Sequence, residues 1–219
     1  MFNNIYNVDV NSILFVDKEC KSPHYKIKDI MFNEKKLEIE TGFIKYDKPI
    51  VVHTNNMVGD NIVLCKNPND ENSIKLFNFV EQIEKKYSEH VGKKIATNIM
   101  KKNVNGEMHD FIIISIRLNV DKTFMIHTND NVPIKSLPTK LHKYLNGGHD
   151  VNYGLLFTGI IVESSDTCKV KISTSQLLID RSSYELDDNR FRTVGEQFGK
   201  RIIECGTRRY VNKKVYESF

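Results

Sequence analysis

The chain has 219 residues, enough for one sizeable hydrophobic core, and its formal net charge of +4 is too small to select or exclude a class of partner. No stretch approaches the roughly 20 apolar residues that a membrane-spanning helix needs, and the first residues lack the basic and apolar regions of a secretory signal peptide. We therefore expect a soluble intracellular protein without a membrane partner.

The N-terminal third of the chain predicts short β-strands. Apolar runs or alternating polar and apolar residues occupy 12–16, 25–30, 36–41, 50–53 and 61–66. A polar turn is expected at 33–35, and Gly42 is expected to break the strand that precedes it. This part of the chain is therefore predicted to be β-rich.

Residues 73–91 predict the best helix of the sequence. Its helical spacing of apolar side chains is set by Ile74, Phe77, Val80, Ile83 and Tyr87. Ser73 is the expected N-cap and Gly92 the expected stop.

Two β-hairpins are expected after the helix. The first joins 111–118 to 123–127 through Asp121 and Lys122, and the second joins 153–162 to 169–179 across the polar turn 163–166. Residues 134–148 between them predict a surface connection. After residue 179 the chain becomes polar, with a short helix expected near 197–204.

These elements together predict a mainly β fold with a helical insert. We expect one domain over residues 1–185, followed by a basic C-terminal extension over 186–219. Strands in two clusters around one helix suit an antiparallel β-barrel of the oligonucleotide/oligosaccharide-binding (OB) type. A β-sandwich is the alternative, because sequence patterns do not fix strand order.

The strand over 169–179 predicts a cationic side. Alternation places Lys169 and Lys171 opposite Val170 and Ile172, so one side of the strand is wet and basic and the other is dry. Lysines in this arrangement are candidates for phosphate contacts, although ordinary surface lysines give the same pattern.

A second candidate site lies in a loop between a glycine and a proline. Phe43, Lys45, Tyr46 and Lys48 crowd into this segment, and an exposed aromatic ring beside a cation is what base stacking requires. The alternative is that Phe43 belongs to the core.

Other basic and aromatic residues are weaker candidates for nucleic-acid contacts. The alternative for the strand residues is a solvated strand face, for the tyrosine a cover over the end of the barrel, and for the two C-terminal arginines a solvated or nuclear-targeting tail. These candidates are Arg117, Lys122, Phe124, Tyr153, Arg208 and Arg209.

The layout of these segments resembles the single-stranded DNA-binding proteins of large DNA viruses and, more distantly, of some phages. The resemblance covers roughly residues 25–180 and rests on the strand at 36–41 with its aromatic, lysine-bearing loop, the helix, and the later strand pairs. It implies an OB-like barrel that coats single strands in viral DNA replication or recombination, in the host nucleus or at a viral replication site. Replication proteins and further copies of the chain would be its protein partners.

The sequence departs from this family in its last residues. Such proteins often end in an acidic tail, whereas this chain ends in Lys213-Lys214-Val215-Tyr216-Glu217-Ser218-Phe219. RNA in place of DNA, and a structural or virion-associated interaction protein that binds no nucleic acid, remain open alternatives.

Catalysis, a metal and a cofactor are not expected. Cys20, Cys65, Cys168 and Cys205 form no C-x-x-C pair and predict reduced thiols. His109-Asp110 and His149-Asp150 are only sequence neighbours, which do not share a face. A metal-dependent nuclease would have to draw on the Asp180 and 187–188 carboxylates, and no accompanying motif supports it.

Overall fold

The computed structural model describes residues 2–20, 22–45, 51–53, 60–104, 106–128, 133–145 and 150–180; for 51–53, 142 and 143 it describes the backbone alone. Several predictions fall outside these residues and stay predictions. They are the contacts of Tyr46, Lys48, Arg208 and Arg209, the state of Cys205, and the basic extension over 186–219 with its short helix.

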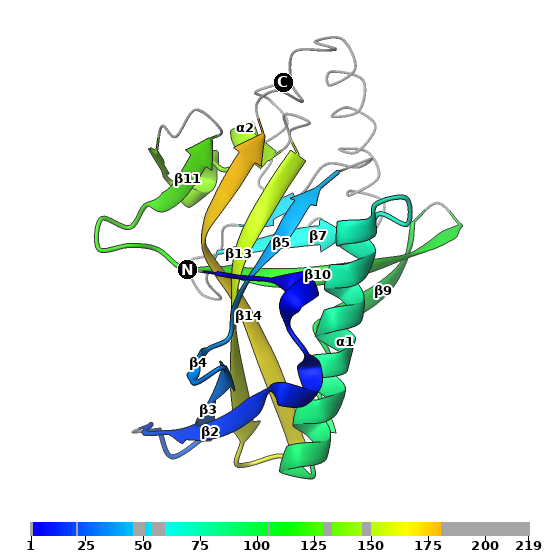
Figure 1. Ribbon diagram of the computed structural model, residues 1–219, viewed down its shortest axis with the longest axis vertical. Helices are drawn as coiled ribbons and strands as arrows, with labels where there is room; N and C mark the ends of the chain where they lie inside the picture. Colours follow the sequence, from blue (N-terminus) through cyan, green and yellow to red (C-terminus); the bar gives the residue numbers. More distant parts are fainter. Residues whose placement is uncertain are drawn as a thin grey trace.

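Strands dominate the described chain, with one long helix and one four-residue helix, which confirms the mainly β class with a helical insert (Figure 1). The strands are β1 (Asn3–Asn4), β2 (Leu14–Lys18), β3 (Tyr25–Phe32), β4 (Lys35–Lys36), β5 (Glu38–Ile44), β6 (Val51–His53), β7 (Asn61–Cys65), β8 (Lys94–Ile95), β9 (Ile99–Val104), β10 (Glu107–Ile116), β11 (Phe124–Thr128), β12 (Ile134–Ser136), β13 (Asp150–Val162) and β14 (Thr167–Asp180). The helices are α1 (Glu71–Val91) and α2 (His142–Leu145), with 3-10 turns at Ile5–Asn7, Val10–Ser12 and Pro138–Lys140.

The strands form one mixed sheet, so the expected purely antiparallel arrangement is wrong. Its main path runs β1-β5-β13-β14-β10-β7-β6, and the pairs β1–β5, β8–β14, β10–β14 and β11–β14 are parallel. Within the described residues β6 does not pair with β1, so the sheet is not a closed barrel there. The architecture is an open mixed sheet with a helix along it.

Helix α1 lies along the long strands β13 and β14 (Figure 1). It begins two residues earlier than expected, because the carboxylate of Asp70 caps it by accepting from the backbone N–H of Ser73 at 2.7 Å. Ser73 is therefore not the N-cap but a buried residue of the first turn. Gly92 ends the helix as predicted, in the left-handed conformation with φ 68°.

The long hairpin of β13 and β14 is confirmed across the polar turn. Its register pairs Gly159 with Val170 and Leu155 with Thr174, then shifts between Gly154 and Leu155, so that Ser175 is an extra residue in β14. Such a bulge bends the strand that carries it.

The expected hairpin between residues 111–118 and 123–127 is wrong. β10 and β11 do not pair with each other, and each pairs in parallel with β14, through Ser115 opposite Ser173 and His127 opposite Leu178. The antiparallel partners of β10 are β9 and β7. Residues 117–123 therefore connect β10 and β11, which both lie beside β14.

Gly42 does not break its strand. β5 passes through it with φ 73°, a conformation that glycine adopts without strain, and continues to Ile44. The amide of Asn72 at the start of α1 lies against this glycine, and its Nδ2 donates to the carbonyl of Phe43 at 2.7 Å. The end of β5 is therefore attached to the first turn of α1.

The core lies between α1 and the sheet. Leu76, Phe77, Val80, Ile83 and Tyr87 of α1 are buried against strand residues, and the rings of Phe79 and Phe157 meet edge to face at a centroid distance of 5.7 Å. Cys65 and Cys168 are buried free thiols and Cys20 is a half-buried one. Among the described helices, none is long and apolar enough to cross a membrane.

Candidate nucleic-acid interface

The two faces of the β13–β14 hairpin have different environments. Gly159 and Phe157 contact Tyr87 and Phe79 of α1, so alternate residues of β13 face the helix. Thr158 and the residues at even positions around it face the opposite way. We call the side opposite α1 the outer face; its β14 residues include Lys169 and Lys171, which pair with Ile160 and Thr158.

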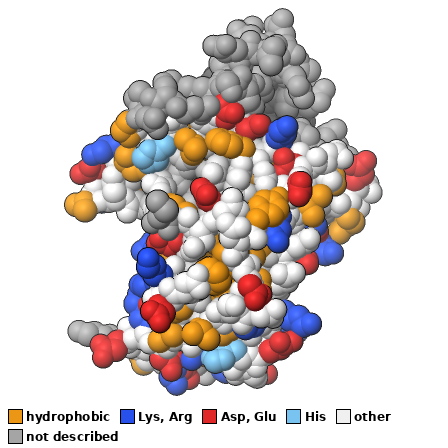
Figure 2. Space-filling view, in the orientation of Figure 1, with side chains coloured by type: hydrophobic (Ala, Val, Ile, Leu, Met, Phe, Trp, Pro, Cys, Tyr) orange, Lys and Arg blue, Asp and Glu red, His pale blue; other side chains and the backbone are white. Residues whose placement is uncertain are grey.

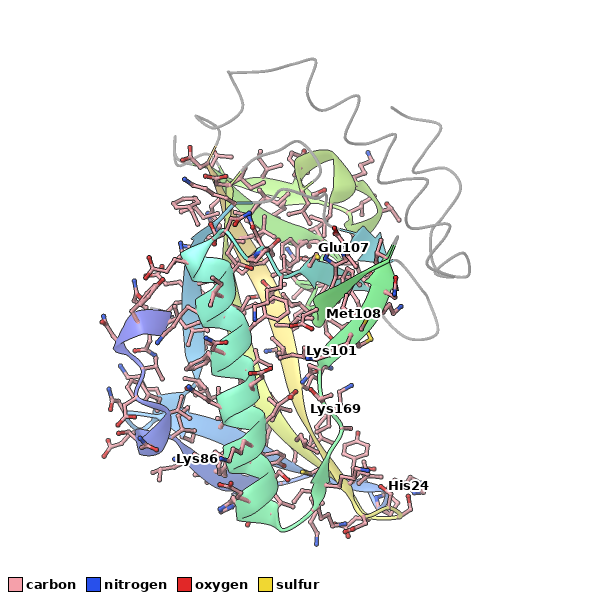
Figure 3. The ribbon with its side chains drawn as sticks, turned by 90° about the vertical axis from the view of Figure 1, so that its right-hand side faces the viewer. His24, Lys86, Lys101, Glu107, Met108 and Lys169 are labelled. Carbon is pink, nitrogen blue, oxygen red and sulfur yellow. The ribbon has the colours of Figure 1, made fainter. Side chains whose placement is uncertain are left out.

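A groove with a volume of about 360 Å³ opens beside these two lysines. Its other lining residues come from β7, β9, β10, β13, β14 and the segment before β9: Asn61, Thr97, Asn98, Met100, Ile113, Ser115, Ile160 and Ile172. Lys169 and Lys171 are exposed, and within the described part of the chain neither ammonium forms an ion pair. Figure 3 shows Lys169 on the same side of the molecule as Lys101 and Met108 of the β9–β10 hairpin.

A buried carboxylate holds one wall of this groove. Glu84 of α1 is 4% exposed and accepts hydrogen bonds from the Thr97 hydroxyl (2.6 Å) and from the backbone N–H and side-chain amide of Asn98 (2.7 Å each). The same Asn98 amide donates to the backbone carbonyl of Val170. Helix, connecting segment and β14 are thereby fixed together directly beside Lys169 and Lys171.

An aromatic residue that the sequence analysis did not single out lies next to the groove. Phe111 of β10 is half-buried, pairs with Met100 of β9, and shares its side of β10 with Ile113. Its ring meets that of His109 at 6.4 Å, edge to face. The signal in the sequence was the alternation His109, Phe111, Ile113, which the dense β-branched run conceals.

The Phe43 and Lys45 candidates are held by the start of α1. The N–H of Lys45 donates to Oδ2 of Asp70 at 3.0 Å, and its carbonyl accepts from the amide of Asn67 at 2.7 Å. Phe43 is half-buried opposite Asn152, and Lys45 is exposed. Sequence reasoning missed Asn67 and Asp70, which fix the backbone where the predicted loop begins.

Phe124 and Tyr153, two of the weaker candidates for nucleic-acid contacts, lie in the core. Each has a relative exposure of 0%. Tyr153 faces α1's side of the sheet, and its N–H donates to the hydroxyl of Thr41 at 3.0 Å. Phe124 begins β11 with its ring inward, so neither ring has a face free for a base.

Arg117 and Lys122 are exposed in the link between β10 and β11. The N–H of Arg117 donates to the carbonyl of Thr174 in β14 at 2.8 Å, and Lys122 sits in a turn with φ 57°. The structure thus brings Lys169 and Lys171 together in the groove and leaves these two residues in a separate connection.

The electrostatics of the remaining described surface are mixed. Lysine and arginine side chains are interspersed with carboxylates over the face shown in Figure 2. Pairs such as Lys26–Glu163 (3.1 Å) and Lys36–Asp29 (3.4 Å) neutralise one another. No group of three or more metal-ligating side chains is present among the described residues. The groove's two lysines therefore differ from these paired surface lysines.

Comparison with known proteins gives a distant structural likeness. No family model and no curated protein sequence matches the chain. Solved structures that resemble it include the "Single-stranded DNA-binding protein from bacteriophage Enc34" and its C-terminal truncation. Both are 14% identical and cover 76% of this chain, with 89% and 94% of their own length matched and TM-scores of 0.43 and 0.41. These values are too low to assign a function, so the function is inferred from the residues of the groove.

Proposed function

We propose that this protein binds single-stranded DNA along the outer face of its sheet. The observation that carries the proposal is the groove beside β14, where Lys169 and Lys171 present two ammonium groups without an ion pair among the described residues. Ammonium groups on one side of an extended strand suit a phosphate backbone that follows the strand.

The groove offers the bases an apolar surface as well. Met100, Ile113 and Ile160 line it, and Phe111 lies beside Met100 with part of its ring exposed. Only unpaired bases can place their faces on such a surface, because in a duplex those faces are stacked on one another. Single strands are therefore favoured over duplex DNA.

In this proposal the protein is a non-enzymatic, OB-like binder that coats single strands. The groove beside Lys169 and Lys171, which we call the lysine groove, binds them without base specificity. Its place would be viral DNA replication or recombination, in the host nucleus or at a viral replication site, with replication proteins and further copies of the chain as partners. The two phage proteins are named for binding single-stranded DNA, which agrees with the proposal without carrying it.

Fluorescence anisotropy with a labelled oligothymidine, without divalent metal and at two salt concentrations, tests the proposal. We expect single-stranded DNA to bind more tightly than the duplex of the same length, with affinity falling as salt rises. The corresponding RNA distinguishes the two nucleic acids. Absence of binding at low salt would refute the proposal and favour a structural interaction protein.

A further inference from the structure

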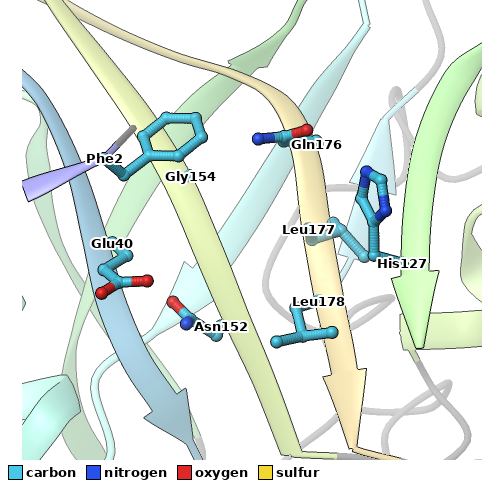
Figure 4. A pocket seen from close by; sticks show the side chains of 8 residues that line it. All are labelled: Phe2, Glu40, His127, Asn152, Gly154, Gln176, Leu177 and Leu178. Carbon is cyan, nitrogen blue, oxygen red and sulfur yellow. The ribbon is translucent and has the colours of Figure 1, made fainter. Parts of the chain in front are cut away.

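A second pocket lies on the outer face, with a volume of about 330 Å³ (Figure 4). The strand register explains its shape. Gly154 of β13 pairs with Glu40 of β5 on one side and with Gln176 of β14 on the other. The middle residue of this row has no side chain, which leaves room between Glu40 and Gln176 for the ring of Phe2.

The aromatic ring of Phe2 forms one wall of this pocket. A Cβ atom at Gly154 would lie 2.6 Å from Cζ of Phe2, so the ring packs directly on the glycine backbone. In Figure 4 the amide of Gln176 extends from β14 toward the side of the pocket that holds this ring. A flat ring on a glycine floor is a surface on which a planar base can stack.

The polar groups of the pocket suit a base edge and not a phosphate. Glu40, Gln176, Asn152 and His127 supply a carboxylate, two amides and an imidazole, and no lysine or arginine lines the pocket among the described residues. In that part of the chain, the side chains of Glu40 and Gln176 have no hydrogen-bond partner. A carboxylate repels phosphate and accepts two hydrogen bonds from adjacent N–H donors.

Guanine is the base whose Watson–Crick edge fits this set. Its N1–H and N2–H groups are adjacent donors for the carboxylate of Glu40, and its O6 accepts from an amide N–H such as that of Gln176. Adenine, cytosine and thymine do not carry two adjacent donors on that edge. The pocket therefore distinguishes guanine by the number of charge-assisted hydrogen bonds it can form.

The pocket and the lysine groove are separate hollows that both lie along β13 and β14. Lys171 pairs with Thr158 and Gln176 pairs with Gly154, four residues away on β13, so both side chains emerge on the outer face. The separation along β13 is roughly 13 Å at about 3.3 Å per residue. A single strand that follows the hairpin passes from the lysines to the pocket.

We propose that the pocket formed by Phe2, Glu40 and Gln176 is a guanine-binding subsite for the single strand. This inference rests on the proposed function and adds a base preference to it. Stacking on Phe2 and the hydrogen bonds to Glu40 and Gln176 would hold one guanine, while the lysine groove binds the remaining nucleotides irrespective of sequence.

The test uses the whole chain and oligothymidines that carry a single central guanine, hypoxanthine or adenine. We expect the guanine oligonucleotide to bind about tenfold more tightly than oligothymidine, and hypoxanthine, which lacks the N2 amino group, to lose most of that gain. Glu40→Gln should abolish the preference and leave oligothymidine binding unchanged. Glu38→Gln, two residues earlier on the same side of β5, is the matched control and should keep the preference.

The outcomes separate the two proposals. Equal affinity for guanine and thymine oligonucleotides, with binding retained, overturns the subsite and leaves single-strand binding standing. A guanine preference that survives Glu40→Gln also overturns the assigned role of Glu40. If no oligonucleotide binds at low salt, the proposed function fails and the subsite with it.

Discussion

Replacing Lys169 and Lys171 by alanine tests the proposed phosphate contacts quantitatively. The two lysines lie two residues apart on one side of β14, about 7 Å along the strand, so they reach different phosphates. For a single strand, each neutralised phosphate contributes about 0.7 to the slope of log affinity against log salt concentration. The double variant should therefore reduce the magnitude of that slope by about 1.4, and each single variant by about 0.7.

The assay is anisotropy titration of a labelled oligothymidine over a series of salt concentrations. Lys85→Ala is the control, because Lys85 is exposed on α1 at the opposite side of the sheet and its ion pair with Glu89 (4.0 Å) is solvated. A double variant whose slope equals that of the unaltered protein would refute the assignment, and so would an equal loss in Lys85→Ala. Circular dichroism of each variant establishes that the fold is retained.

Three further predictions concern stability and titration. Glu84→Ala removes the acceptor of three hydrogen bonds and should lower the free energy of unfolding by about 2–3 kcal/mol in urea denaturation. The control Glu81→Ala, at an exposed position of the same helix, should change the free energy of unfolding little, and equal effects of the two variants would contradict the prediction. Gly159→Ala places a Cβ 2.5 Å from Cζ of Tyr87 and should lower the free energy of unfolding by about 1–3 kcal/mol in the same measurement. An unchanged free energy of unfolding would show that the ring moves freely. The ammonium of Lys28, which donates to Asp17 at 2.8 Å, lowers the pKa of that carboxyl. The pair stabilises the fold at pH values above the unfolded-state pKa of Asp17, and this stabilisation is lost as the pH falls through the lower folded-state pKa. Lys28→Met should therefore raise the pKa of Asp17 in an NMR titration. No rise would exclude the pair as the cause.

Local patterns in the sequence predicted the elements that are stabilised by local contacts. The helix was predictable because apolar residues recur on one side of 74–87, and the β13–β14 hairpin because two alternating runs flank a short polar turn. The exposure of Lys169 and Lys171 followed from the same alternation. Their contact with DNA stays a prediction.

The parts that failed depend on distant pairing. β10 and β11 were predicted to be hairpin partners because they are adjacent in sequence, yet each pairs in parallel with β14, a strand that comes later in the chain. Tyr153 was a candidate for nucleic-acid contact or a cover over the end of the barrel, but its position in the alternation of β13 directs the ring toward the core. The pocket of Phe2, Glu40 and Gln176 joins three segments that no sequence pattern connects.

The shared edge of β14 has a consequence for the synthesis of the protein. β8, β10 and β11 each bond to this edge in turn, at Thr167, Ser173 and Gln176, and all three leave the ribosome before β14 does. Until about residue 180 has emerged, these earlier strands expose unpaired backbone edges, a state prone to aggregation. Completion of the sheet is therefore a late step in biogenesis, and a nascent chain stalled before β14 is the species on which we expect chaperones to act.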